Sequence, residues 1–129
     1  MMSSAHNDYT IAWICALLVE VAAARAMLDK IHHPLPKSSA DLNAYELGEL
    51  DGHYIVITCL PAGVYGTVAA ANVVSRMRPT FPQLQYGLMV GIGGGVSGQN
   101  NDIQLDDVVV SKPNREHSGV IQYDYSKAV

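Results

Sequence analysis

Positive charge is scarce in this chain of 129 residues, which has 8 Lys and Arg residues against 12 Asp and Glu residues and a formal net charge of -4. The few basic residues are scattered along the sequence rather than clustered. A protein that binds nucleic acid needs a basic face, so this composition excludes nucleic acid as a partner. Small molecules and other proteins are the partners that we expect.

Cysteine is also scarce, with Cys15 and Cys59 each inside an apolar, strand-like run. Neither cysteine, and none of the five histidines, has the spacing of a metal-ligand cluster, so no metal site is predicted. Isolated cysteines in apolar runs are typical of reduced core residues. Because reduced cysteines are the rule in reducing compartments, the sequence predicts a cytoplasmic protein.

The chain also lacks a segment with the features of a signal peptide or of a membrane span. Its most apolar stretch, 11–28, contains Glu20 and Arg25, and no Lys or Arg precedes it. A signal peptide begins with positive charge, and charged side chains are costly inside a bilayer. We therefore predict neither a signal peptide nor a membrane partner.

What the chain does have is a hydrophobic content of 49%, arranged in segments that alternate between strand-like and helical periods. This pattern predicts one globular α/β domain over 1–129. Asp51-Gly52 predicts a hairpin, Thr67 is expected to cap the second helix, and Pro79 to lie beyond its end. We expect a surface loop over 32–41, strands over 9–16, 44–50, 54–60, 86–90 and 107–111, and helices over 21–31 and 67–77.

Four glycines in five positions, Gly91 to Gly95, follow the apolar run Leu88-Met89-Val90. Such a backbone can turn sharply and approach a ligand closely. Residues 93–98 also match the pattern G-x-G-x-x-G, but a polar segment follows where a dinucleotide-binding fold needs a helix. The glycine run therefore predicts a ligand-binding loop without a nicotinamide cofactor.

Several ordered motifs together resemble a known family. They are Ile14-Cys15-Ala16-Leu17 with Glu20, Leu60-Pro61-x-Gly63-x-Tyr65-Gly66-Thr67, Leu88-Met89-Val90-Gly91-Ile92-Gly93-Gly94-Gly95, Asp102-Ile103-x-Leu105-x-Asp107-Val108-Val109-Val110-Ser111 and Gly119-Val120-x-Gln122-Tyr123-Asp124. The chain resembles the N-terminal half of the nucleoside phosphorylase and nucleosidase superfamily. It is most similar to the purine nucleoside phosphorylase-like domains of filamentous fungi, which are often fused to NACHT or ankyrin-repeat regions.

The resemblance implies cleavage of the N-glycosidic bond of a purine nucleoside, with water or inorganic phosphate as the nucleophile and no cofactor. Glu20 matches the glutamate that contacts the attacking water in the nucleosidase branch, and it is the predicted catalytic residue. A carboxylate in the first turn of a helix is also stabilised by the helix dipole alone. Both roles stay open for Glu20 at this point.

Two loops are the predicted binding sites for the ribose or for phosphate. The first contains Gly63, Gly66 and Thr67, where free N–H groups at a helix start suit an anion or a ribose hydroxyl. Its structural alternative is a simple strand-to-helix turn. The second loop contains Gly91, Ile92, Gly93 and Gly94, which resemble the family's loop beneath the ribose or phosphate.

The fold implied by the resemblance is a three-layer sandwich, in which helices flank a central, mostly parallel, twisted sheet. Two departures stand out: Asp106 replaces a glycine that is usual in the family, and family members are roughly twice as long. The missing half would supply the base-stacking aromatic, a ribose-binding glutamate and the acid that protonates the purine.

Three functions therefore remain open: a nucleoside-cleaving enzyme, a non-catalytic nucleoside-sensing or oligomerisation module, and a repurposed pocket for another small metabolite. All three predict a homo-oligomer, because a truncated sheet leaves open edges and apolar faces.

Overall fold

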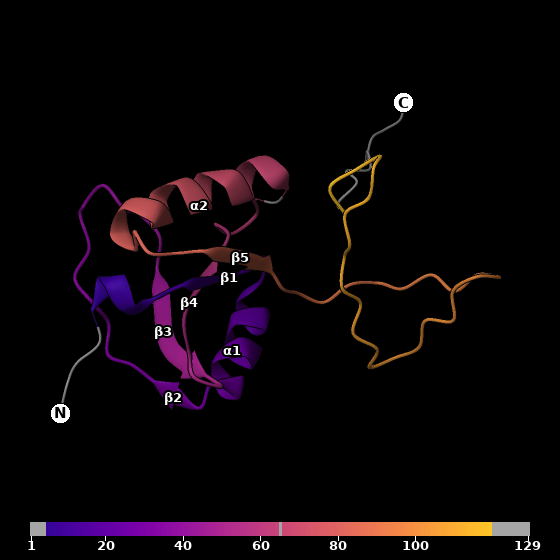
Figure 1. The fold of residues 1–129 in the computed structure, drawn as a ribbon, viewed down its shortest axis with the longest axis horizontal. Helices are drawn as coiled ribbons and strands as arrows, with labels where there is room; N and C mark the ends of the chain where they lie inside the picture. Colours follow the sequence, from indigo (N-terminus) through magenta and orange to yellow (C-terminus); the bar gives the residue numbers. More distant parts are fainter. Residues whose placement is uncertain (1–4, 65, 120–129) are drawn as a thin grey trace. The chain divides into compact units, whose positions relative to one another are not determined.

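The computed structural model describes residues 5–64 and 66–119. Contacts within the chain divide it into two units, residues 1–92 and 93–129. The prediction of one domain over 1–129 stays a prediction. Figure 1 shows that the labelled helices and strands all belong to the first unit.

The first unit is an α/β structure built on a five-stranded sheet. Its elements are a 3-10 helix His6–Asp8, β1 Ile11–Cys15, α1 Leu18–Met27, β2 Lys30–Ile31, β3 Tyr45–Leu50, β4 His53–Cys59, α2 Thr67–Thr80 and β5 Tyr86–Met89. The strand order is β2-β3-β4-β1-β5. β1 runs parallel to β4 and β5, whereas β3 is antiparallel to β2 and β4. The predicted α/β class is confirmed, but the sheet is mixed rather than mostly parallel.

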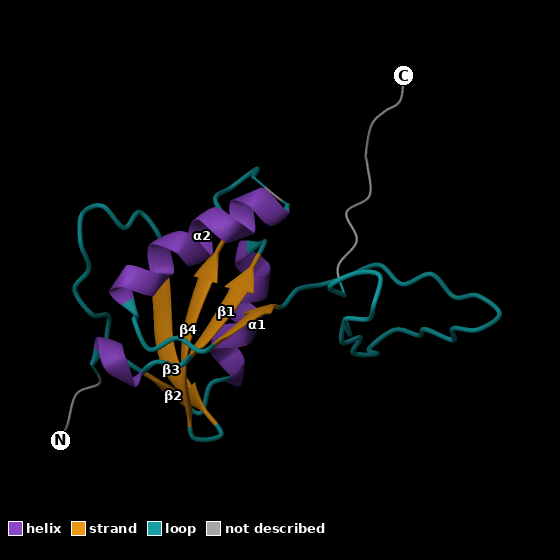
Figure 2. Cartoon of the chain, turned by 45° about the horizontal axis from the view of Figure 1, so that its top comes forward, coloured by secondary structure: helices purple, strands orange, loops and turns teal. Residues whose placement is uncertain are grey.

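The two helices pack against different sets of strand residues. Successive side chains of a strand point to opposite faces of a sheet. Ile14 belongs to a buried cluster with Val73 and Met77 of α2, whereas the next residue, Cys15, belongs to a cluster with Ala24 of α1. Figure 2 shows the two helices beside the strands. Both faces of β1 and β4 are covered, which explains why these strands contain apolar runs.

The hairpin between β3 and β4 is confirmed. Leu50 pairs with His53, so only Asp51 and Gly52 form the turn. Their φ angles are 51° and 80°, and a two-residue type I′ turn requires positive values at both positions. His53, predicted to lie in the turn, is the first residue of β4.

The predicted helix over 21–31 is wrong at both ends, because α1 spans Leu18–Met27 and the chain then enters β2. β2 pairs with β3, where Ile31 lies opposite Gly48. A Cβ atom on Gly48 would lie 2.5 Å from both the Leu28 Cδ1 atom and the Lys30 carbonyl oxygen. The missing side chain of Gly48 therefore lets the segment after α1 lie against the sheet edge instead of continuing as a helix.

The second helix also differs from its prediction. Gly66 is the N-cap of α2 and makes no side-chain cap, so Thr67 is the first helical residue and does not cap it. Pro79 lies inside the helix, which ends at Thr80. A proline removes one main-chain donor, and at this position the loss falls in the last turn, where the Phe81 N–H closes the helix by donating to the Met77 carbonyl at 2.8 Å.

The second unit contains no helix or strand over its described residues, 93–119. The strand predicted over 107–111 is wrong there: Val108, Val109 and Val110 are 88%, 73% and 82% exposed. β-branched residues favour a strand only when a neighbouring strand supplies hydrogen bonds and packing. The motif match beyond Gly119 lies outside the described residues. Over the part of the chain that the structure describes, no helix has the length and apolarity needed to cross a membrane.

Candidate functional site

The candidate site lies at the carboxyl ends of β1, β4 and β5. The connection after β1 leads through α1 towards β2, whereas the connection after β4 leads through α2 to β5 on the other side. The chain thus leaves the neighbouring strands β1 and β4 in opposite directions. In open α/β sheets, ligands bind at such a switch point, beyond the carboxyl ends of the strands.

Glu20 lies at this edge and is almost fully buried, at 8% exposure. Its Oε1 atom accepts hydrogen bonds from the N–H groups of Ala16 and Leu17, each at 3.0 Å. Its Oε2 atom accepts one from the Ile92 N–H at 2.7 Å. One carboxylate therefore joins the end of β1, the first turn of α1 and the segment after β5. Glu20 therefore does have a structural role in the first turn of α1, and its hydrogen bond to Ile92 extends this role beyond the helix.

These hydrogen bonds keep Glu20 ionised. The N–H of Ile92 lowers the pKa of the carboxyl most, and those of Leu17 and Ala16 lower it further, against the opposing effect of burial. Main-chain donors that point at a carboxylate favour its charged form. The site thus contains a fixed negative charge with its acceptor positions largely engaged.

Gly91 is required by the close approach of Glu20. A Cβ atom at this position would lie 2.7 Å from the Oε2 atom and 3.0 Å from the carboxyl carbon of Glu20. Real Cβ atoms do not approach other heavy atoms so closely. The first glycine of the run therefore makes room for the carboxylate, and Ile92 beside it donates the hydrogen bond.

The other predicted site residues are not all brought to Glu20. Gly63 and Gly66 lie in the loop between β4 and α2, with φ angles of 76° and 102° that favour glycine. The Leu60 N–H donates to the Cys15 carbonyl at 2.8 Å, so this loop starts beside the end of β1. Gly93 and Gly94 belong to the second unit, and their place relative to Glu20 stays a prediction.

A hollow of about 510 Å³ lies away from these predicted residues. It is lined by Ala5, His6, Asn7, Pro36, Lys37, Ser38, Pro79, Thr80 and Pro82, which come from the N-terminal segment, the loop before β3 and the end of α2. None of the predicted site residues lines it. Among the described residues, no group of three or more His, Cys, Asp or Glu side chains could hold a metal ion.

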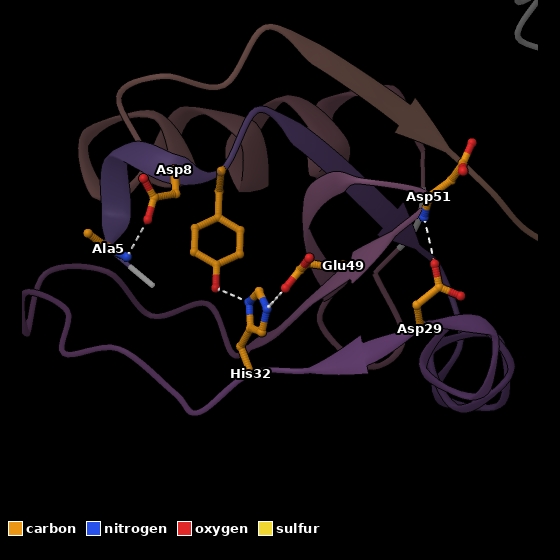
Figure 3. A network of polar contacts seen from close by, with 7 residues as sticks. Ala5, Asp8, Asp29, His32, Glu49 and Asp51 are labelled. Atoms are coloured by element: carbon orange, nitrogen blue, oxygen red, sulfur yellow. Dashed lines mark hydrogen bonds and ion pairs between the residues drawn. The ribbon is translucent and has the colours of Figure 1, made fainter. Parts of the chain in front are cut away.

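A partly buried hydrogen-bond network around His32 was not predicted from the sequence, which had placed this residue in a surface loop. The Tyr9 hydroxyl lies 2.6 Å from His32 Nδ1. His32 Nε2 lies 2.7 Å from Glu49 Oε2, and Figure 3 shows these two side chains facing each other. A carboxylate only accepts, so Nε2 carries the proton that is donated to Glu49. The contact with the Tyr9 hydroxyl is the second hydrogen bond of the imidazole ring. These hydrogen bonds connect the start of the loop to β3 and to the segment before β1.

Asp41, at the other end of the same loop, is also buried, at 6% exposure. Its Oδ2 atom accepts hydrogen bonds from the hydroxyls of Tyr45 at 2.6 Å and Thr80 at 2.5 Å, and its Oδ1 atom accepts one from the Asn43 N–H at 3.0 Å. Both ends of the predicted surface loop are therefore fixed to the core. Spacing along the chain gives no signal for these contacts, because Thr80 lies in a different element, 39 residues away from Asp41.

Comparison with known proteins gives one informative similarity. The chain is 48% identical, over 126 residues, to a protein of the fungus Hyaloscypha variabilis that is named a nucleotide-binding leucine-rich repeat (NLR)-like protein. The match covers 97% of this chain but only 12% of the length of that relative. The chain is thus homologous to a short segment of a much longer protein. No protein-family model and no solved structure matches the chain.

Proposed function

We propose that this chain is a nucleoside phosphorylase-like module that binds a purine nucleoside at the carboxyl ends of β1, β4 and β5. The observation that carries the proposal is the position of Glu20, whose carboxylate joins its own motif after β1 to the glycine run after β5, two motifs that the family resemblance had singled out separately. A sheet with helices packed against different sets of strand residues is also what the family's three-layer sandwich requires.

The geometry of Glu20 favours binding over cleavage. A carboxylate offers about four acceptor positions, and main-chain N–H groups engage three of them. The remaining position suits a ribose hydroxyl, which donates a hydrogen bond to a fixed anion. A glutamate that activates water must instead be free to orient and receive a proton. Glu20 therefore acts in this proposal as the anchor of a binding loop.

The long fungal relative supports a module within a larger protein. Its name describes nucleotide binding, and this chain corresponds to a small part of its length. A domain that binds a nucleoside without cleaving it suits a sensing role in such an assembly. The two free cysteines favour a reducing, cytoplasmic compartment for this role.

A homo-oligomer remains part of the proposal. β5 pairs with β1 on one side, and Tyr86, Leu88 and Met89 are 64%, 47% and 58% exposed. An apolar strand at a sheet edge offers main-chain groups and side chains to a second copy. Sedimentation of the chain over a range of concentrations tests this point, and a monomer at all of them contradicts it.

Calorimetric titration with adenosine, inosine and methylthioadenosine, with and without phosphate, tests the binding itself. We expect binding by the unmodified chain, at least a tenfold loss in Glu20→Gln, and no change in Glu46→Gln, whose side chain is 44% exposed on β3. Chromatography of the same mixtures detects free base. No binding of any nucleoside overturns the proposal, whereas base release that is lost in Glu20→Gln replaces it with nucleoside cleavage.

A further inference from the structure

The two cysteines of the chain lie side by side on neighbouring parallel strands. Cys15 is the last residue of β1, Cys59 is the last residue of β4, and the register places them directly opposite each other. Paired residues of neighbouring strands have their side chains on the same face of the sheet, with Cα atoms about 4.8 Å apart. Disulfides form across Cα separations of about 4.4–6.8 Å. The backbone thus holds the two thiols within bonding reach.

The surroundings keep both residues as thiols. Burial, together with the negative charges of Glu20 and of the Cys59 thiolate, raises the pKa of the Cys15 thiol to about 11. Burial and the charge of Glu20 also raise the pKa of Cys59. The effect of the Cys59 charge on the pKa of Cys15 agrees with the strand register, because electrostatic interactions weaken with distance and the register places the two residues side by side. Cys59 is partly exposed, whereas Cys15 is fully buried.

We propose that Cys15 and Cys59 form a dithiol site that closes to a disulfide when the chain meets a low-molecular-weight disulfide such as oxidised glutathione. This inference does not depend on nucleoside binding. Because Cys59 is the more accessible residue, it reacts first. Closure links the carboxyl ends of β1 and β4, directly before the N–H groups of Ala16 and Leu17 that bind Glu20.

The exchange proceeds in two steps. The Cys59 thiolate attacks one sulfur of glutathione disulfide, which forms a mixed disulfide and releases one glutathione thiolate, and that thiolate takes up the proton that Cys59 lost. Cys15 then loses its proton and attacks the Cys59 sulfur, which releases and protonates the second glutathione. Two protein thiols are oxidised by two electrons, and one glutathione disulfide is reduced to two thiols.

Mass spectrometry of the intact chain after incubation with oxidised glutathione at mildly alkaline pH tests the site. We expect the unmodified chain to lose two hydrogen masses and both free thiols, and to return to its starting mass with a reductant. Cys15→Ser keeps the mixed disulfide, because no second thiol displaces glutathione. Cys59→Ser stays unmodified, because its remaining thiol is buried. A stable glutathione adduct on the chain that contains both cysteines, or a disulfide between two chains, overturns the proposal.

A second reagent tests the same geometry without oxidation. Phenylarsine oxide bonds to two neighbouring thiols through its arsenic atom and releases one water. We expect one reagent molecule per unmodified chain, bound so that an excess of a monothiol does not remove it. Each single variant should lose the reagent to the monothiol. Equal retention by a single variant and by the unmodified chain shows that the two thiols do not act together, and it contradicts the proposal.

Discussion

Two buried carboxylates hold the first unit together, and they do so in different ways. Glu20 accepts hydrogen bonds from three main-chain N–H groups. Asp41 accepts two from side-chain hydroxyls and one from a main-chain N–H group. The Glu20 contacts thus survive any change of the partner side chains that preserves the backbone. The Asp41 contacts depend on Tyr45 and Thr80 in addition to the backbone.

The difference separates a candidate site from a structural joint. Backbone donors around Glu20 come from the ends of β1 and β5, where a ligand is expected, and one acceptor position is left over. The donors around Asp41 come from Asn43 just before β3, from Tyr45 at the start of β3 and from Thr80, the last residue of α2. Asp41 therefore fixes the long loop to the core, and its loss should affect stability without a specific effect on ligand binding.

Asp41→Ala is expected to cause the largest loss of stability. It leaves the hydroxyls of Tyr45 and Thr80 and the N–H of Asn43 without their acceptor, inside the protein. Hydrogen bonds to a charged group contribute about 1.5–3 kcal/mol each, so we expect the free energy of unfolding to fall by about 3 kcal/mol or more. Urea denaturation measures it.

Single removals of the Asp41 donors sharpen this result. Tyr45→Phe and Thr80→Val each remove one hydroxyl and leave the carboxylate two partners, so each should cost about 1–2 kcal/mol. The Tyr45 hydroxyl also accepts a hydrogen bond from Asn43 Nδ2 at 3.0 Å, which makes its removal the costlier of the two. If Asp41→Ala lowers the free energy of unfolding no more than Thr80→Val does, the other hydrogen bonds to Asp41 do not contribute to stability.

Glu20→Gln should cost less, about 1–2 kcal/mol, because one amide oxygen still accepts from part of the backbone. The amide nitrogen, which is a donor, then faces at least one N–H group across 2.7–3.0 Å. Urea denaturation measures the loss, with Glu46→Gln as the matched control at an exposed glutamate that pairs with Arg25 at 3.4 Å. Equal stability of both variants and the unmodified chain contradicts the role of Glu20 as an anchor.

The contrast between the two carboxylates also shows what can be predicted from the sequence. Glu20 was predicted as a site residue because it matches a motif of the family that the chain resembles, and the glycine run was predicted because it follows an apolar, strand-like run. Asp41 and His32 were assigned to a surface loop, because proline and serine between them indicate irregular backbone but not burial. Their partners lie on other elements, and only the folded chain brings them together. The same holds for β2, whose pairing depends on Gly48 in a different strand.

Gly91→Ala tests the Glu20 anchor from the opposite side and should cost about 1 kcal/mol. The new Cβ would lie 2.7 Å from Oε2, so the carboxylate must move away from the Ile92 N–H. Side-chain movement absorbs part of the overlap, which keeps the loss at the lower end of the range of about 1–3 kcal/mol for overpacking. We expect a weaker nucleoside affinity in the same variant.

Gly87→Ala is the matched control for this substitution. Gly87 lies four residues earlier in β5, and a Cβ there meets no atom within 4 Å. Alanine also loses less conformational freedom on folding than glycine, so this variant should be as stable as the unmodified chain or slightly more so. A greater loss in Gly87→Ala than in Gly91→Ala would contradict the close contact between Gly91 and Glu20.

Acid should weaken both carboxylate networks, with the smallest effect of these changes. The pKa of Asp41 is lowered: burial alone would raise it, but the hydrogen bonds from Thr80, Tyr45 and Asn43 outweigh burial. The pKa of Glu20 is lowered by the N–H of Ile92 and its neighbours. A carboxyl whose pKa is lower in the folded state stabilises it above the unfolded pKa of about 4, and this contribution is lost as the pH falls through the folded value. A protonated carboxyl still accepts through its carbonyl oxygen, so the loss of stability stays below that caused by the substitutions.

Urea denaturation between neutral and acidic pH tests this effect. The urea midpoint should fall less steeply with decreasing pH in Asp41→Asn and Glu20→Gln than in the unmodified chain. Parallel curves for all three would show that neither carboxylate is coupled to folding.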